Sequence, residues 1–100
     1  MKMFKKDGLT AVLVSPGFGA GFSTWGNPEM AVDFDLVEAF LKEDMERFNY
    51  ILEEKYDSPY DGGVAGLQVQ WVPEGTQFMI DEYDGSESIV NISSLDTFTA

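Results

Sequence analysis

The stretch of residues 69–92 constrains the fold of this chain most strongly, because β-forming runs alternate there with two turn sequences. The first, PEGT at residues 73–76, places a residue of fixed φ early in a loop and a glycine late in it. The second, Asp84-Gly85, is typical of a two-residue type I′ turn, in which both residues have positive φ. The stretch therefore predicts a three-stranded antiparallel meander.

The loop lengths predict which side chains face each other across this meander. A four-residue first loop places Trp71 opposite Phe78, so that one face of the first hairpin is apolar and needs a cover. A two-residue second loop places Glu82 opposite Glu87, and two like charges in that position are mildly destabilising. Either both carboxylates splay into water, or this tip of the hairpin meets a basic partner.

A single long helix is predicted over residues 33–56. Asp33 or Asp35 can cap its start, acidic residues crowd its first turns, and no Gly or Pro interrupts it. Its apolar side chains sweep an arc of about 180°, wider than the roughly 100° that one core-facing stripe requires. Residues 35–56 are therefore a candidate homodimer surface. Asp44 falls inside the arc and either marks a gap between two apolar stripes or is buried with a partner.

The remaining segments complete a small α+β fold. Residues 9–15, LTAVLVS, are β-branched and apolar, and we expect a buried central strand there. Residues 1–8 form a basic arm and residues 93–100 a tail, and both are expected to be loose unless Leu95 and Phe98 dock the tail. We predict one domain over residues 1–100 in the order β-α-β-β-β, with a mostly antiparallel twisted sheet and one long helix packed on a face.

The chain contains neither cysteine nor histidine. It therefore has no disulfide, thiol nucleophile or thiolate metal site, and it lacks the residue that serves most often as a general base near neutral pH. An enzyme would have to rely on carboxylates alone, for example with Mg²⁺ held by Asp81, Asp84 or Glu87, but no loop has the ligand spacing of a known metal cage. We expect no catalytic residues, no metal and no cofactor.

Negative charge is concentrated in the second half of the chain. The net charge is −12, with 18 acidic residues against 6 basic ones, and no Lys or Arg follows Lys55. Such a field repels nucleic acids and anionic lipids and attracts basic surfaces, unless it serves solubility alone. We expect a protein partner with a basic surface and no direct nucleic-acid binding. The candidate partner-binding residues are Asp81, Glu82, Asp84 and Glu87.

The N-terminus starts like a signal peptide, with several lysines, but its apolar run at residues 11–14 is too short for one. No apolar run in the sequence is long enough to span a bilayer. We therefore expect a cytoplasmic protein that does not associate with membranes.

Residues 16–28, PGFGAGFSTWGNP, form a glycine-rich loop with aromatic residues. Glycines directly after a strand are typical of loops whose backbone N–H groups converge on an anion, although the dinucleotide and P-loop motifs are incomplete here. Alternatively, the glycines let the chain turn tightly while the aromatics fill the core. If the loop binds a small ligand such as a nucleotide or metabolite, the candidate residues are Ser15, Gly17, Gly19, Gly21, Ser23, Thr24 and Trp25.

Two blocks, VLVSPGFGAGFSTW at residues 12–25 and WVPEGTQFMIDEYDGSESI at residues 71–89, resemble a family of small acidic proteins of tailed bacteriophages whose activity is unassigned. The resemblance implies the cytoplasm of an infected bacterium as the setting. By analogy, small acidic phage proteins such as anti-restriction and anti-CRISPR inhibitors occupy basic or nucleic-acid-binding surfaces of host proteins.

The leading hypothesis is an accessory protein that binds a host protein through its acidic surface, as an inhibitor or nucleic-acid mimic directed at a host defence system. One alternative is a protein that binds or sequesters a small ligand at the loop of residues 16–28. The other is a structural dimer or virion component, which the wide apolar arc of the predicted helix favours.

Overall fold

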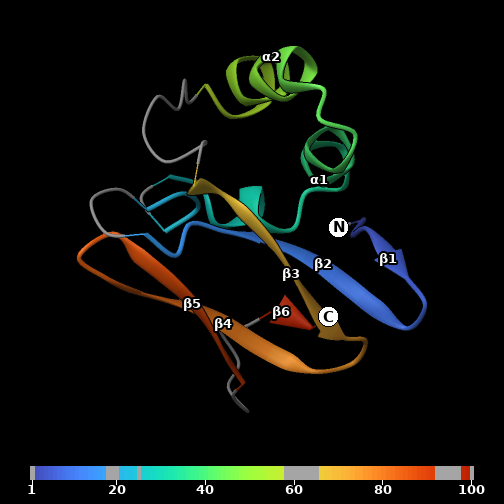
Figure 1. Ribbon diagram of the computed structural model, residues 1–100, viewed down its shortest axis with the longest axis vertical. Helices are drawn as coiled ribbons and strands as arrows, with labels where there is room; N and C mark the ends of the chain where they lie inside the picture. Colours follow the sequence, from blue (N-terminus) through green and yellow to red (C-terminus); the bar gives the residue numbers. More distant parts are fainter. Residues whose placement is uncertain (1, 18–20, 25, 58–65, 92–97, 100) are drawn as a thin grey trace.

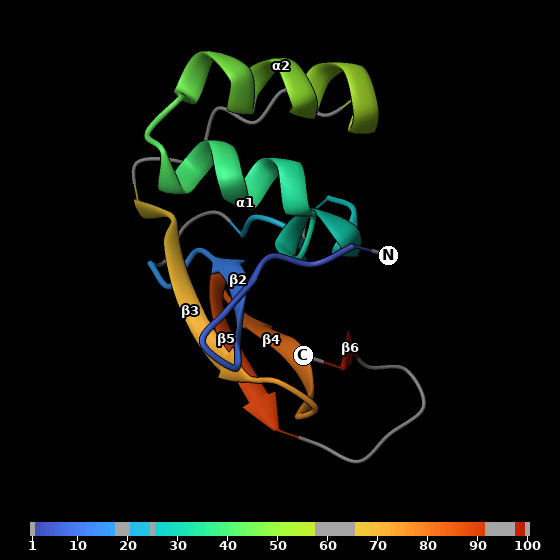
Figure 2. The same ribbon diagram turned by 90° about the vertical axis from the view of Figure 1, so that its right-hand side faces the viewer.

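The computed structural model describes residues 2–17, 21–24, 26–57, 66–91 and 98–99. Two helices, a first β-sheet and a second β-sheet form three layers (Figure 1). Both helices lie on the same side of the first sheet (Figure 2). The elements are β1 (Lys5–Lys6), β2 (Leu9–Val14), the 3₁₀-helix η1 (Pro28–Ala31), α1 (Phe34–Leu41), α2 (Met45–Tyr56), β3 (Gln68–Pro73), β4 (Gln77–Tyr83), β5 (Ser86–Asn91) and β6 (Phe98–Thr99).

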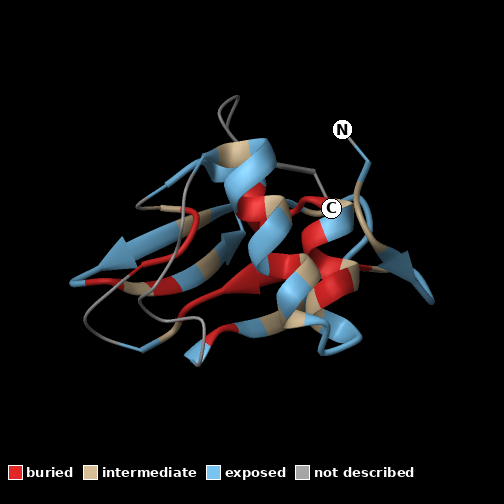
Figure 3. Ribbon diagram, turned by 90° about the horizontal axis from the view of Figure 1, so that it is seen from above, coloured by how far each residue is buried: buried red, intermediate tan, exposed pale blue. Residues whose placement is uncertain are grey.

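Strand β2 is the central strand of the first sheet, whose order is β1-β2-β3. Because successive side chains of a strand point to opposite faces, β2 contributes to two cores. Ala11 and Leu13 pack in the core beneath the helices, whereas Val12 and Val14 pack in the core between the sheets. All four side chains are fully buried, and Figure 3 shows the buried residues concentrated on this strand and on the helix faces turned toward it. The prediction of a buried central strand is confirmed.

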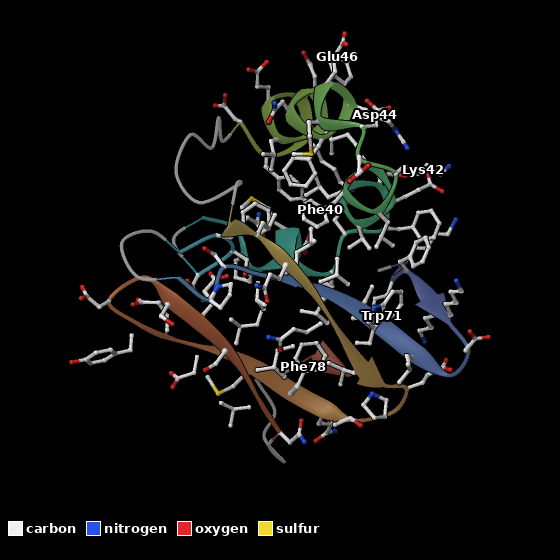
Figure 4. The ribbon with its side chains drawn as sticks, in the orientation of Figure 1. Phe40, Lys42, Asp44, Glu46, Trp71 and Phe78 are labelled. Atoms are coloured by element: carbon white, nitrogen blue, oxygen red, sulfur yellow. The ribbon has the colours of Figure 1, made fainter. Side chains whose placement is uncertain are left out.

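The prediction of one long helix is wrong, because the chain reverses after α1. Glu43 has a left-handed backbone with φ of 57°, which ends the first helix. Asp44 then caps α2, and its side chain accepts a hydrogen bond from the Arg47 N–H at 3.2 Å. Figure 4 labels Lys42 and Asp44 at this reversal. The apolar arc is wide because it belongs to two helices that pack on each other, so the observation that suggested a homodimer has an explanation within one chain.

The first hairpin of the predicted meander is also absent, since β3 pairs with β2 rather than with β4. The turn at residues 73–76 carries the chain from the first sheet to the second, whose order is β5-β4-β6. Trp71 and Phe78 are therefore not cross-strand neighbours. Phe78 is fully buried between the two sheets, where Figure 4 labels it, and it packs in one cluster with Val12 and Val72.

The second hairpin is confirmed in both its turn and its register. Asp84 and Gly85 have φ of 53° and 85°, as a type I′ turn requires. Glu82 lies opposite Glu87 in the pairing of β4 with β5. The local turn sequence was therefore sufficient to predict this part of the second sheet.

Each end of the chain contributes a short strand that was not expected. Residues 5–6 form β1, which pairs with β2 through a turn at Asp7 and Gly8, again with positive φ at both positions. The tail contributes β6, which pairs with β4 so that Phe98 lies opposite Phe78. Leu95 lies outside the described residues.

The fold is therefore α+β with antiparallel sheets, as predicted, but the described residues form two sheets and two α-helices. Among the described residues, no helix is both long enough and apolar enough to cross a membrane.

Replacing Asp44 by Ala tests the helix break. The substitution removes the cap of α2 and should lower the free energy of unfolding by about 1 kcal/mol. Urea unfolding of this variant should be compared with that of Glu53→Ala, in which the altered residue is exposed within the same helix. If residues 34–56 formed one continuous helix, Asp44→Ala would instead be neutral or stabilising, since Ala is the better residue inside a helix.

Candidate functional site

The two regions singled out from the sequence meet at the start of β5. Glu87 was expected among the exposed acids of the second hairpin, but the residue is only 2 % exposed. Its carboxylate lies against the first part of the glycine-rich loop. Glu87 is therefore a buried structural residue and does not belong to the acidic surface.

Four donors from the loop bind the Glu87 carboxylate. Its Oε1 atom accepts a hydrogen bond from the Ser15 N–H at 2.9 Å. Its Oε2 atom accepts from the Phe22 N–H at 2.7 Å, the Thr24 N–H at 3.0 Å and the Thr24 hydroxyl at 2.6 Å. An ionised carboxylate offers about four acceptor positions, so these four donors match its capacity in number, with one at Oε1 and three at Oε2.

Two further hydrogen bonds fasten the start of the loop to β5. The Glu87 N–H donates to the Ser15 carbonyl oxygen at 2.8 Å, and the Ser86 hydroxyl donates to the Pro16 carbonyl oxygen at 2.7 Å. Figure 1 shows this loop next to the turn between β4 and β5. The loop that follows β2 and the acidic hairpin are therefore one connected unit.

Among the aromatic residues of the loop, the structure describes Phe22, and this residue packs in the core. Phe22 is almost fully buried, and its ring stacks on that of Phe48 from α2 with 6.1 Å between centroids. Of the candidate ligand-binding residues, Ser15, Gly21 and Ser23 are buried, Thr24 is half-buried and Gly17 is exposed. Gly19 and Trp25 lie outside the described residues. The expected convergence of backbone N–H groups on an anion is present, but the anion is the chain's own Glu87.

The other three acids of the second hairpin are exposed. Asp81, Glu82 and Asp84 form no ion pair within the described part of the chain. Glu82 accepts a hydrogen bond from the Gly85 N–H at 3.0 Å, which supports the turn. We call these three residues the acidic tip.

The second sheet also turns a partly apolar face outward. Strand alternation points Phe78 and Ile80 into the molecule and Met79 and Tyr83 away from it. Tyr83 is 76 % exposed and Met79 is 39 % exposed, and Val90 lies opposite Met79 on β5 with a similar exposure. We call Met79, Tyr83 and Val90 the outer face. It adjoins the acidic tip along β4.

The described cations lie elsewhere in the molecule. Lys5 pairs with Glu74 at 3.0 Å beside the first sheet, and Arg47 of α2 pairs with Glu38 at 2.9 Å. Lys55 at the end of α2 pairs with Asp33 at 2.6 Å. The β4–β5 hairpin itself contains no Lys or Arg, so its field is that of its carboxylates.

Asp33 joins the two helices. Its Oδ1 atom accepts from the N–H groups of Asp35 and Leu36 and so caps α1, while its Oδ2 atom accepts from the Lys55 ammonium and, at 2.5 Å, from the Tyr56 hydroxyl. Burial would raise the pKa of Asp33, but the hydrogen bonds from Lys55, Tyr56 and Leu36 outweigh it and lower the pKa.

The pKa values of the two side chains that bind Asp33 shift in the opposite direction. The hydrogen bond to Asp33 raises the pKa of Lys55, and burial together with the same carboxylate raises the pKa of Tyr56. A cavity of about 430 Å³ lies beside this cluster, lined by Lys2, Glu29, Asp33, Phe34, Asp35 and Lys55. Because both Asp33 oxygens are used within the protein, we assign the cluster to the joining of α1 and α2 rather than to a ligand.

The described residues contain no group of three or more acidic side chains placed to hold a metal ion. Comparison with known protein families, with curated proteins and with solved structures finds no match for this chain.

Proposed function

We propose that this protein binds a basic surface of a partner protein through the acidic tip and the outer face of the second sheet. The observation that carries the proposal is the composition of this hairpin: exposed carboxylates adjoin exposed apolar side chains, and neither strand supplies a cation. An acidic surface of this kind attracts a basic partner over a distance and orients it during the encounter.

The outer face adds binding energy that the exposed charges alone do not supply. Exposed carboxylates contribute mainly to the association rate, and salt weakens their attraction for a basic partner. Aromatic side chains, in contrast, are frequent contributors to binding energy at protein interfaces, and a tyrosine ring also binds arginine through its face. Tyr83 is such an aromatic side chain: it is exposed and lies between Asp81 and Asp84 in the sequence. The hairpin therefore combines electrostatic attraction with an aromatic contact.

The setting we propose follows from the resemblance to small acidic phage proteins: the cytoplasm of an infected bacterium, with a host defence protein as the partner. A protein that presents carboxylates to a basic, nucleic-acid-binding surface would inhibit that host protein by occupying the surface. We do not extend the proposal to a nucleotide at the glycine-rich loop, because the N–H groups of Phe22 and Thr24 in that loop, and of Ser15 before it, already bind Glu87.

The test compares two variants with the same change in net charge. The tip variant carries Asp81→Asn, Glu82→Gln and Asp84→Asn, and the control variant carries Glu46→Gln, Glu53→Gln and Glu54→Gln on the exposed side of α2. The probe is a fluorescent nona-arginine peptide, whose binding is measured by anisotropy at low salt and in 0.5 M NaCl. We expect the tip variant to bind about tenfold more weakly than the wild type at low salt and the control variant within about twofold of it.

Equal losses in the two variants would show that the peptide responds only to net charge, and the proposal would then be wrong. In 0.5 M NaCl the wild type should lose most of its affinity, since a Debye length near 4 Å screens exposed charges. A Tyr83→Ala variant should weaken binding without changing its salt dependence.

A further inference from the structure

We propose that the donors around the Glu87 carboxylate form a preorganised site that selects a small monocarboxylate, and that this site is filled by Glu87 in the wild type and accepts a free ligand when the side chain is truncated. The site consists of the N–H groups of Ser15, Phe22 and Thr24 and the hydroxyl of Thr24, and we call these donors the carboxylate cradle. The cradle is distinct from the acidic tip, so this inference does not depend on partner binding.

The cradle holds its ligand by hydrogen bonds rather than by a cation. Glu87 forms no ion pair with any described Lys or Arg, and its cross-strand neighbour is the like-charged Glu82. Charge-assisted hydrogen bonds to a carboxylate are short and about twice as strong as neutral ones, and the four donors lie between 2.6 and 3.0 Å from its oxygens. Such a set of donors recognises the carboxylate group itself.

Other parts of the fold position the cradle independently of Glu87. Ser15 directly follows β2, which is paired with β3 along its whole length. Phe22 is anchored by its ring in the core beneath the helices. Thr24 lies in a turn that the Gly26 N–H closes on the Ser23 carbonyl oxygen at 3.2 Å. We therefore expect the donors to keep their arrangement when the Glu87 carboxylate is removed.

The chemical identity of the ligand follows from the atoms that a truncation deletes. Glu87→Ala removes the CH₂–COO⁻ group beyond Cβ, which acetate reproduces as CH₃–COO⁻. The substitution removes the acceptor of these four donors, two of them buried and the two of Thr24 half-buried, and the loss of an acceptor at such positions is costly. Acetate should refill this space, formate should fit more loosely, and the larger trimethylacetate should be excluded.

The experiment measures the melting temperature of Glu87→Ala at pH 7 in sodium acetate and in sodium chloride of equal ionic strength. In chloride the variant should melt well below the wild type. In 0.1 M acetate we expect it to recover about 7 °C, as for a site with a Kd of about 10 mM. Trimethylacetate should give no recovery. The matched control is Glu82→Ala, which removes the opposite, exposed glutamate and should not respond to acetate.

Two results would overturn the inference. One is an equal effect of acetate on the wild type, Glu87→Ala and Glu82→Ala, which would be a general salt effect. The other is a Glu87→Ala chain that stays unfolded in acetate. Glu87→Gln provides an independent check, because its amide matches the glutamate in shape but replaces one acceptor oxygen by a donor. It should fold, melt below Glu82→Gln and ignore acetate; a melting temperature equal to that of Glu82→Gln would contradict the cradle.

Discussion

Phe78→Ala is expected to lower the free energy of unfolding by about 3–5 kcal/mol, the range for truncating a buried phenylalanine. The ring is fully buried in the cluster that holds the two sheets together. Domains of this kind have total stabilities of about 5–15 kcal/mol, so the variant should be close to unfolding at room temperature. Urea unfolding followed by circular dichroism measures the loss.

The neighbouring Met79→Ala is the matched control for this prediction. Met79 follows Phe78 on β4 and points to the exposed side of the same strand. Its truncation should cost less than about 1 kcal/mol, as is usual for exposed positions. Similar losses for the two variants would mean that the sheets do not pack through Phe78, and the layered arrangement would then be wrong.

Asp33→Asn is expected to have the second largest effect, about 2–4 kcal/mol at pH 7. The substitution keeps the shape of the side chain but removes the charge that binds Lys55 and Tyr56, and it leaves the Tyr56 hydroxyl with a poorer acceptor. The loss should be at the lower end for a broken buried ion pair, because the Lys55 side chain is 52 % exposed and keeps part of its hydration.

The loss caused by Asp33→Asn should depend on pH with a defined sign. Because the pKa of Asp33 is lowered in the folded protein, its carboxylate stabilises the fold fully above the ordinary value of 3.8. This stabilisation disappears as the pH falls through the lower folded-state pKa. The difference in unfolding free energy between wild type and variant should therefore be constant from pH 7 to about pH 5 and shrink toward pH 2.

Asp35→Asn is the control for this pH series, since Asp35 is exposed and lies two residues further along the chain. Its effect at pH 7 should be small, because exposed charges contribute little to stability. A pH-independent difference for Asp33→Asn would contradict the stabilising role of the ionised Asp33 carboxylate.

Features determined by neighbouring residues were the ones that the sequence predicted well. The turn at Asp84-Gly85 and the register that follows from it depend on residues a few positions apart. The same holds for β2, whose continuous apolar run reflects burial on both faces. Asp7-Gly8 carries the same turn signal and forms a turn with the same signs of φ, but the strand before it is too short to be recognised.

The errors have two physical origins. The apolar periodicity continues through residues 42–44, so it did not reveal that Glu43 adopts positive φ and that Asp44 starts a second helix. In addition, alternation shows that a strand exists but not which strand it pairs with. Strand β3 pairs with β2, more than fifty positions away in the chain, and not with the nearby β4.

The candidate site shows the same limit. Glu87 was assigned to the acidic surface and Ser15 and Thr24 to the glycine-rich loop, and each assignment used only nearby residues. Their contact spans up to 72 positions and depends on how the second sheet lies on the first. One signal was present in the sequence: a loop whose backbone N–H groups converge can bind an anion, and a glutamate placed opposite another glutamate avoids repulsion if it turns toward such donors.

The proposal that the second sheet binds a basic partner is tested most directly by titrating the nona-arginine peptide into ¹⁵N-labelled protein and recording amide chemical shifts at 0.05 M and 0.5 M NaCl. The proposed site predicts that the low-salt shift changes concentrate on β4, the Asp84-Gly85 turn and β5, and that they largely disappear at high salt. Changes concentrated on α1 and α2, or spread evenly over the molecule, would contradict it.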